Sequence, residues 1–556
     1  MRTVGIGIQS FEAIRKENYF YVDKTSFIKE WWESRDDVTL IMRPHGFGKS
    51  LNMDMLNCFF SNRYAGRSDL FEGTEIWKDE KYRELQGTYP VIYLSFADVK
   101  GKTFSEAKLG IIRALNRAME PYEDVLNQSE ERTGYPFHKP EPDSQKSEIT
   151  GALKWFSFIL HSVFKKKVLI FLDDYETPMY EAYVNGYAED MDYFIQSFCT
   201  SAFKANQDME RALLTGVTRI PKDRGFGGFN NAFVCTMTSR KFETDFGFTQ
   251  EEVDQSLKEY DLSDQKESVR DWYGGYASGK ETDIYNPSSI LQFLKNQEYR
   301  SYCERNHGNA LTSHELQIAS NRIKSQMEDL LNGGTVETEI DEQISFSRLK
   351  MNQEAIWSLL LASGYLKVVS IIFDGEEYHY VLAITNLEVR LMFRKLIGEW
   401  FGPVKDNYND FVRSLIDGNT DNANEDLEQI LMNTVSFYDT GKKLTDLNKH
   451  ESFYHGLVLG MIAQEREYRI TSNRESGRGR YDVMMKPLKK GLPGIIIEFK
   501  IFDSKREKDL NETAERALKQ IADKNYDTEL IAEGIPEENI MHYGMAFSGK
   551  DVVIIR

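Results

Sequence analysis

The chain has 556 residues, of which 41% are hydrophobic and 28% charged, and its formal net charge is −19. This length predicts two to four domains, and this composition is typical of globular proteins and excludes extensive disorder. The acidic balance excludes a general attraction to nucleic acids, so contact with DNA or RNA would require a local basic patch.

Cysteine usage and hydropathy indicate a cytoplasmic protein without a membrane span. The four cysteines lie far apart and form no CxxC pair, so neither a zinc site nor a disulfide framework is expected. The N-terminal residues lack the apolar core of a signal peptide, and no segment has about 18 consecutive apolar residues.

The first motif is a strand, a loop and a helix between residues 38 and 59. An apolar run from Val38 to Met42 precedes a loop rich in Pro and Gly, and helical spacing begins near Lys49. This is the context of a phosphate-binding loop, in which backbone N–H groups and a helix N-terminus surround the phosphates. Lys49 would reach the β- and γ-phosphates of ATP, and Ser50 would bind Mg²⁺. The predicted nucleotide-binding residues of this loop are Gly46, Phe47, Gly48, Lys49, Ser50 and Leu51.

A second acidic strand would complete the Mg²⁺ site of this loop. The apolar run from Val168 to Leu172 predicts a strand buried on both faces. Asp173 and Asp174 follow at its carboxyl end, where open α/β sheets bind ligands. Asp173 would bind Mg²⁺ through water, and Asp174 would orient the attacking water. Because Asp174 is one methylene shorter than the usual Glu, slow hydrolysis is expected.

Further strands of the same sheet are expected at residues 91–96 and 212–217. Thr215 and Arg219, at the end of the second of these strands, are candidate sensors of the γ-phosphate. A surface charge is an equally good interpretation of Arg219. An ordinary capped helix is the alternative for the phosphate loop, because Arg43 replaces its usual first glycine, and a solvated acidic turn is the alternative for the aspartates.

The middle region predicts helices and one hairpin. Helical spacing covers residues 314–331 and 353–361, and strands at 365–372 and 378–384 predict the hairpin. We interpret residues 285–404 as a helical lid with a small winged element. No basic stripe in this region indicates DNA binding.

The C-terminal region predicts strands at residues 468–471, 481–485 and 494–500, then a helix at 506–524 and two more strands. Asp482 is expected on the middle strand, and Glu498 and Lys500 on the third. Because side chains alternate along a strand, Glu498 and Lys500 point to the same face. Two carboxylates form a hard-oxygen site for Mg²⁺, with Mn²⁺ as a substitute and the Phe499 carbonyl as a further ligand.

Such a site hydrolyses phosphodiesters when other polar groups complete it. The metal would polarise a phosphate and lower the pKa of a bound water, and Lys500 would orient that water or neutralise developing charge. Gln520 on the following helix and Glu451 on the preceding helix are further catalytic candidates. Between Arg466 and Lys508 there are twelve Lys or Arg against six Asp or Glu, which is a local basic excess. An ion pair on a solvated sheet edge is the alternative interpretation.

The two sites together resemble a bacterial family with an N-terminal AAA-ATPase-like domain and a C-terminal PD-(D/E)XK nuclease-like domain. The resemblance runs nearly end to end and rests on segments such as YVDKTSFI (21–28), RPHGFGKSL (43–51), FLDDYETPM (171–179), SNRESGRGRYD (472–482) and IIIEFK (495–500). His45 and Gly46 stand where a pair of arginines is usual. Residues 173–176 read D-D-Y-E where D-E-Y-D is usual, so Asp174 replaces a Glu and Glu176 replaces an Asp.

The resemblance implies an α/β multidomain protein: a P-loop NTPase domain with an AAA-like parallel sheet in residues 1–284, a helical and winged-helix-like middle region in 285–404, and a restriction-endonuclease-like α/β domain in 405–556. It implies ATP binding and a Mg²⁺-dependent nuclease that hydrolyses DNA under control of the ATPase domain. The alternative is a STAND- or AAA-like signalling ATPase whose C-terminal domain binds nucleic acid or protein without cleavage. ATP and DNA are the expected partners, while RNA as substrate and a homo-oligomer stay open.

Overall fold

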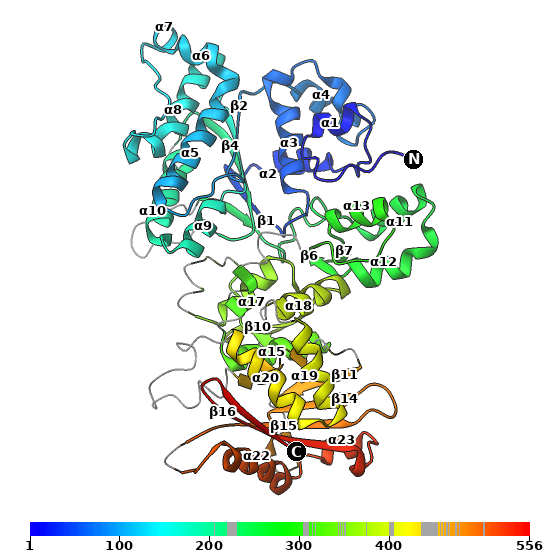
Figure 1. Cartoon of the computed structure of the whole chain (residues 1–556). Coiled ribbons are helices and arrows are strands. Elements are labelled where there is room, and N and C mark those ends of the chain that lie inside the picture. Colours follow the sequence, from blue (N-terminus) through cyan, green and yellow to red (C-terminus); the bar gives the residue numbers. More distant parts are fainter. Residues whose placement is uncertain are drawn as a thin grey trace. The chain divides into compact units, whose positions relative to one another are not determined.

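The chain forms two units in the computed structural model (Figure 1). The first unit comprises Met1–Thr312 and Glu337–Val389, and the second comprises Ser313–Val336 and Arg390–Arg556. The division at residues 284 and 404 stays a prediction. The structure describes all residues except 205, 220–230, 304–310, 314, 317–318, 343, 345, 347–348, 350–351, 374, 400–404, 435–453, 456, 460, 463–464, 466, 473–474, 478 and 504–505.

A five-stranded parallel sheet is the centre of the first unit. Its strands are β1 (Val38–Met42), β2 (Val91–Ser95), β3 (Val168–Asp173), β4 (Met209–Gly216) and β5 (Phe233–Cys235), in the order β2-β3-β4-β1-β5. The strands expected near residues 91 and 212 are therefore confirmed. Every residue of β1 and β3 is buried, as the apolar runs indicated. In this order β4 lies between the strand that leads into the phosphate loop and the strand that ends in the acidic pair.

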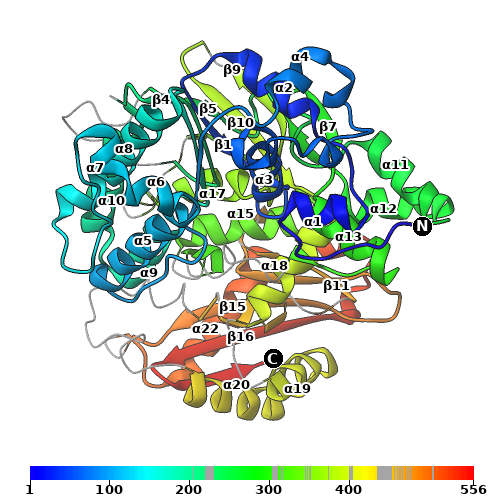
Figure 2. The same ribbon diagram turned by 90° about the horizontal axis from the view of Figure 1, so that it is seen from above.

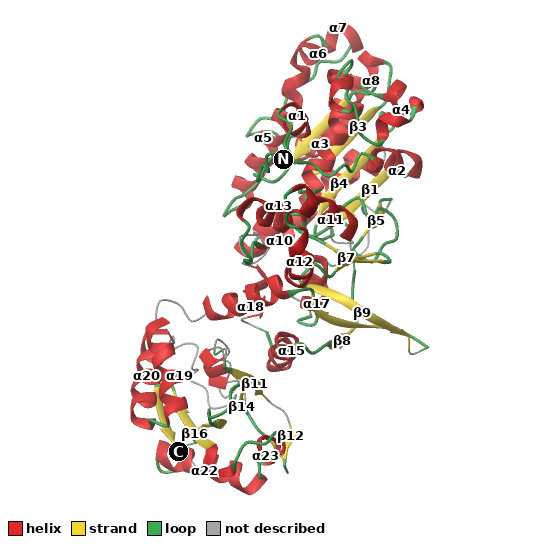
Figure 3. Cartoon of the chain, turned by 90° about the vertical axis from the view of Figure 1, so that its right-hand side faces the viewer, coloured by secondary structure: helices red, strands yellow, loops and turns green. Residues whose placement is uncertain are grey.

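Helices cover both faces of this sheet, as Figure 3 shows. The helices of the first unit are α1 (Phe11–Lys16), α2 (Ser26–Ser34), α3 (Lys49–Phe60), α4 (Glu80–Leu85), α5 (Phe104–Met119), α6 (Glu123–Asn127), α7 (Ser129–Thr133), α8 (Lys146–Phe164), α9 (Thr177–Asn185), α10 (Ala188–Cys199), α11 (Gln250–Glu259), α12 (Lys266–Tyr273), α13 (Pro287–Asn296) and α17 (Ala355–Ala362). Of these, α11, α12 and α13 pack in an apolar cluster that is separate from the cores of the sheet. Alternate strand residues supply two cores: Leu40 and Ile170 pack with α5, α8 and α10, whereas Ile41 and Phe171 pack with α1, α2 and α3. Because apolar side chains pack on both faces of the sheet, the positions of the strand ends are determined, and with them the positions of the polar residues that follow the strands.

Two smaller sheets follow the main sheet in the chain. A hairpin joins β6 (Tyr276–Ser278) to β7 (Glu281–Ile284), and a three-stranded sheet has the order β8-β10-β9 (β8, Val336–Thr338; β9, Leu366–Phe373; β10, Tyr378–Ile384). The antiparallel pairing of β9 with β10 confirms the predicted hairpin. Helices α15 (Asn321–Leu331) and α18 (Leu387–Glu399) complete the middle region.

The second unit contains a mixed sheet of order β11-β14-β15-β16-β17. Its strands are β11 (Tyr468–Ser472), β14 (Val483–Pro487), β15 (Gly494–Ile501), β16 (Ile540–Ser548) and β17 (Asp551–Ile555). Only the β15–β16 pair is parallel among the strand pairs of this sheet that the structure describes. A two-residue pair, β12 (Glu475–Ser476) and β13 (Gly479–Arg480), precedes β14.

Helices lie on both faces of the mixed sheet, with α22 (Leu510–Lys524) on one side of β16 and α19 (Lys405–Asp417) and α20 (Thr420–Thr434) on the other (Figure 2). Ile497 and Phe499 pack in the core with α19 and α20, whereas Ile496 packs in the core with α22 and α23 (Thr528–Ala532). The alternation therefore turns Glu498 and Lys500 toward α22. Together the two sheets confirm the predicted α/β class. No helix among the described residues is long and apolar enough to cross a membrane.

Candidate nucleotide and metal sites

The phosphate loop closes around Lys49 at the start of α3. Gly46 and Gly48 have φ angles of +81° and +83°, a left-handed conformation that glycine adopts at little cost. The Lys49 side chain is buried, and its Nζ donates hydrogen bonds to the carbonyls of Arg43 (2.9 Å) and Pro44 (3.0 Å). The loop carbonyls thus accept from the ammonium group, a task that the phosphates of a bound nucleotide would take over.

Arg43 is a structural residue of the loop. Its side chain is fully buried, and its guanidinium donates to the carbonyls of Met42 and Phe242, each at 3.2 Å, and to the carbonyl of Thr236. These bonds tie the end of β1 to the segment that follows β5. The loss of the usual first glycine therefore has a local explanation, because the arginine joins two parts of the sheet edge.

Asn286 supports the loop from a distant part of the sequence. Its Nδ2 donates to the His45 carbonyl at 3.0 Å, and its Oδ1 caps α13 by accepting the Ser288 N–H. A Cβ added at Gly46 would lie 2.6 Å from Asn286 Oδ1, so the close approach requires glycine at position 46. The sequence indicated only a helix start at Asn286 and gave no sign of this contact.

The acidic pair lies at the carboxyl end of β3, as predicted. Asp173 is buried and accepts a hydrogen bond from the Thr215 hydroxyl group, which comes from the neighbouring strand β4. Asp174 has a φ of +50°. Burial raises the pKa of Asp174 to about 6, the charge of Asp173 adds to this shift, and Lys49 opposes it.

Glu176 is a third carboxylate of this region. Burial raises its pKa to about 8, and the nearby charge of Asp174 raises it further. Its Oε1 accepts the Val217 N–H at 2.8 Å, while its Oε2 has no hydrogen-bond partner among the described residues. In the sequence, Glu176 stood out only because its side chain is longer than that of the usual Asp. Its burial depends on the packing of the chain after β4, which no local pattern reveals.

Some of the predicted nucleotide-binding residues line a cavity of about 330 Å³. Its lining includes Gly46, Phe47, Gly48, Lys49, Ser50, Leu51 and Asp174. Apolar wall residues are Ile6, Ile8, Phe20, Phe248 and Leu291. Asp173, Thr215 and Arg219 do not line it.

Arg219 is buried, and this burial lowers the pKa of its guanidinium. The backbone N–H of Arg219 donates to the Ile344 carbonyl at 2.9 Å. The interpretation of Arg219 as a surface charge is therefore wrong.

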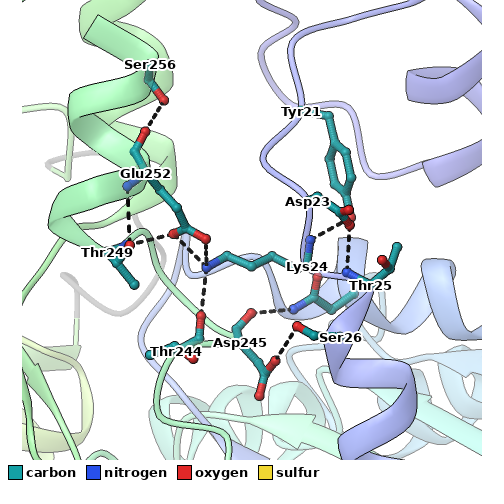
Figure 4. A network of polar contacts seen from close by, with 11 residues as sticks. Tyr21, Asp23, Lys24, Thr25, Ser26, Thr244, Asp245, Thr249, Glu252 and Ser256 are labelled. Atoms are coloured by element: carbon teal, nitrogen blue, oxygen red, sulfur yellow. Dashed lines mark hydrogen bonds and ion pairs between the residues drawn. The ribbon is translucent and has the colours of Figure 1, made fainter. Parts of the chain in front are cut away.

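A buried ion pair holds another wall of the cavity. Figure 4 shows Lys24 reaching Glu252, and its Nζ donates to both Glu252 oxygens and to the Thr244 carbonyl, each at 2.7 Å. Lys24 and Asp245 line the cavity. Asp245 accepts from Ser26 at 3.4 Å, and burial raises its pKa well above the ordinary value. The YVDKTSFI segment is thus fixed by residues more than two hundred positions later.

The second constellation lies where β14 and β15 separate. Asp482 Oδ2 accepts the Phe499 N–H at 2.7 Å, and Lys500 Nζ lies 2.9 Å from Glu498 Oε1. Gln520 of α22 also donates to Glu498 Oε1. Glu498 is 1% exposed, so both donors reach a carboxylate that water scarcely contacts. The structure therefore brings these predicted residues together.

One detail of the prediction was wrong, because Asp482 precedes β14 instead of lying within it. Pairing of β14 with β15 ends at Val483 and Ile497. Beyond that point the Asp482 side chain accepts the strand N–H. Burial raises the pKa of Asp482, and the Phe499 hydrogen bond and the charge of Lys500 oppose the shift.

Two further groups that the sequence did not single out surround the acidic residues. His455 Nε2 lies 3.1 Å from the Asp482 carbonyl, and its ring lies edge-on to Phe499 at 5.5 Å. The Tyr526 hydroxyl group donates to the Arg480 carbonyl at 2.7 Å. The FYHG segment was recognised only as part of a helix. Glu451 lies outside the described residues.

The donor set fits a hard divalent cation. No group of three or more His, Cys, Asp and Glu side chains suited to a metal occurs in the described part of the chain. Asp482 and Glu498 offer carboxylate oxygens. The Phe499 carbonyl lies on the Asp482 side, because the N–H and C=O of a strand residue share one edge and the N–H points to Asp482. Few protein ligands, all oxygen, suit Mg²⁺, which keeps several waters.

Two family models each match one part of the chain. Residues 5–226 match the family model of predicted AAA-ATPases, which covers the phosphate loop and the acidic pair, and residues 449–556 match that of the PD-(D/E)XK nuclease superfamily. A protein of Azotobacter chroococcum mcd 1, described as "Uncharacterized protein in vnfD 5'region", is 24% identical over 392 residues, which cover 69% of this chain and 68% of that protein. The chain therefore joins an AAA-ATPase-like domain to a C-terminal domain of the PD-(D/E)XK nuclease superfamily.

Proposed function

We propose that the protein is an ATP-binding nuclease of the cytoplasm that hydrolyses DNA phosphodiester bonds under control of its ATPase domain. The observation that carries this proposal is the convergence of Asp482, Glu498 and Lys500 on the face of the sheet that α22 covers. The four cysteines, all described by the structure, are buried and form no disulfide, which agrees with a reducing compartment.

Each side chain of the acidic site has a separate task in this proposal. Asp482, Glu498 and the Phe499 carbonyl would hold Mg²⁺ or Mn²⁺, which when bound polarises a phosphate and lowers the pKa of water. Lys500 balances the charge of Glu498 and would donate hydrogen bonds that orient the attacking water or neutralise the developing negative charge. Gln520 fixes the orientation of the Glu498 carboxylate.

The ATPase domain would exchange internal contacts for nucleotide contacts. Lys49 would leave the Arg43 and Pro44 carbonyls for the β- and γ-phosphates, Ser50 would hold Mg²⁺, and Asp173 would bind it through water. Asp174, with a pKa of about 6, is largely ionised at pH 7 and accepts a proton from water. The apolar walls of the cavity receive the nucleoside.

DNA is the proposed substrate because the stretch of sequence that contains the site is rich in basic residues, whereas the whole chain is acidic. Residues 466–508 carry twelve Lys or Arg against six Asp or Glu, although the whole chain has a charge of −19. Such a local excess supplies phosphate contacts without reading sequence. RNA shares this phosphate chemistry and is assayed beside DNA.

The deciding experiment measures cleavage of plasmid and linear DNA with Mg²⁺ or Mn²⁺, with and without ATP. Asp482→Asn and Lys500→Ala are each expected to lower the rate about 100-fold, the scale of losing one electrostatic group. Lys78→Ala is the matched control, because Lys78 is an exposed partner of Glu75 and lies outside the basic stretch 466–508. Equal cleavage by the wild type, D482N and K500A would contradict the nuclease assignment.

A signalling ATPase without nuclease activity is the second candidate. It is favoured by the internal contacts of the acidic site, since Glu498 Oε1 accepts from both Lys500 and Gln520. A C-terminal domain in which this network is structural would bind nucleic acid or protein without cutting. Nucleotide-dependent assembly of the chain, with no cleavage of DNA or RNA, would support this candidate.

A further inference from the structure

Tyr526 joins the two sides of the acidic site. It follows the left-handed C-cap Asn525 of α22, and only 1% of its surface is exposed. Its ring packs edge-on against Tyr481 at 6.2 Å. Its hydroxyl group donates to the Arg480 carbonyl at 2.7 Å and accepts from Gln520 Nε2 at 3.2 Å. One buried hydroxyl group thus contacts both the helix and the segment before β14.

The Gln520 amide depends on this hydroxyl group for its orientation. A side-chain amide carries two N–H donors, and here one goes to Glu498 and the other to Tyr526. Without the tyrosine oxygen the second donor would lose its acceptor in a buried place. The amide would then turn, and its hydrogen bond to Glu498 would weaken.

The Arg480 carbonyl lies two residues before Asp482, in a stretch that the main sheet does not pair. Hydrogen bonds at both ends of this stretch hold it: the Tyr526 hydroxyl group donates to Arg480, and the Phe499 N–H of β15 donates to Asp482, whose carbonyl also lies by His455. The backbone of Tyr526 is itself fixed, because its carbonyl accepts the Ser476 hydroxyl group at 2.7 Å. The position of Asp482 therefore depends on the turn that follows α22.

We propose that Tyr526 is a positioning residue of the acidic site, whose hydroxyl group bridges Gln520 and Arg480 and so holds Glu498 and Asp482 at the separation that one divalent cation needs. The inference rests on the proposed nuclease function. Tyr526 touches neither carboxylate through a hydrogen bond given by the structure; it acts through Gln520 and the backbone.

The test compares Tyr526→Phe with Tyr543→Phe in the full chain. Tyr543 is also fully buried and donates its hydroxyl proton to a backbone carbonyl, that of Leu415 at 2.6 Å, but it lies in the core on the opposite face of the sheet. Each variant loses the hydrogen bond from its hydroxyl group to a backbone carbonyl, and Y526F also loses the bond that Gln520 donates. Titration with Mn²⁺, followed by electron paramagnetic resonance, should show affinity about tenfold lower for Y526F and unchanged for Y543F. The cleavage rate constant should fall in Y526F while KM for DNA stays constant.

Wild-type affinity for Mn²⁺ in Y526F, or an equal loss in Y543F, would overturn the positioning role. The proposed function fails separately, if D482N binds Mn²⁺ as tightly as the wild type. Hydrogen exchange without metal tests the geometry in either case. The Phe499 amide should exchange at least several-fold faster in Y526F than in the wild type or Y543F, and unchanged exchange would refute the role of Tyr526.

Discussion

The Asp482 carboxylate accepts a 2.7 Å hydrogen bond from the Phe499 N–H, at the point where β14 no longer pairs with β15. A side chain thus continues the hydrogen bonding that backbone carbonyls provide along the rest of the strand. The place where the two strands separate is therefore held by a hydrogen bond and belongs to the site. Gln520 of α22 and Lys500 bound it.

Asp482→Asn separates metal binding from stability. Asparagine can still accept the Phe499 N–H, but it removes an ionic ligand, so Mn²⁺ affinity should fall at least about tenfold. Burial raises the pKa of Asp482, which means that its ionised form costs stability above the ordinary pKa of Asp. The Tm of D482N in EDTA at pH 7.5 should therefore equal or exceed that of the wild type. A clear drop would show that the charge stabilises the fold.

Gly544→Ala should disturb the acidic site by displacing helix α22, which carries Gln520. Gly544 lies on β16 where α22 approaches most closely, and a Cβ there would overlap the Ala514 carbonyl of the helix. Overpacking of this kind costs about 1–3 kcal/mol. Thermal melting should show a lower Tm, and cleavage should slow because Gln520 moves away from Glu498. Gly151→Ala, where the added methyl meets open space, serves as control and should not lower the Tm.

Arg43→Gly would restore the usual glycine of a phosphate loop, yet it should destabilise the protein. The variant removes the arginine donor from the carbonyls of Thr236 and Phe242, of which Thr236 keeps the Ser239 N–H, and opens a buried space, at a cost of about 3 kcal/mol. Arg240→Gly removes an exposed arginine from the same segment and should change stability by less than about 0.5 kcal/mol. Equal melting temperatures for the two variants would contradict this role of Arg43.

Glu176→Gln should change the pH dependence of stability. Glu176 has a pKa of about 8 in the folded chain, far above the ordinary value near 4.5, so the folded state binds the extra proton between these values. Wild-type stability therefore falls as pH rises through this window and levels off above about pH 8. The Tm advantage of E176Q should grow from pH 6 to pH 8.5. Glu189→Gln, at an exposed position of α10, controls for net charge, and a constant difference for E176Q would be the contrary result.

The parts predicted well from the sequence are those that local patterns determine. Apolar runs located β1, β3 and β15, and alternation along β15 predicted that Glu498 and Lys500 share a face. These inferences need only the strand period and the rule that polar residues at the ends of parallel strands meet at one sheet edge.

The parts that escaped prediction depend on distances between elements. Asn286 contacts the phosphate loop 241 residues away, and the Tyr526 hydroxyl group reaches Arg480 across 46 residues. Thr215 contacts Asp173 but does not line the cavity, because the packing of β4 against β3 directs its hydroxyl group sideways. Such contacts follow from packing, for which a single sequence contains no periodic signal.

The Lys24–Glu252 ion pair bears on how the ATPase half can be isolated for biochemistry. The family match ends at residue 226, but the partners of Lys24, the Glu252 carboxylate and the Thr244 carbonyl, come later in the chain. A recombinant fragment cut at that match boundary would expose an ammonium group whose neighbours have been deleted, together with the open edge of β1. Fragments for expression should therefore end after α13, so that they keep β5 and the partners of Lys24.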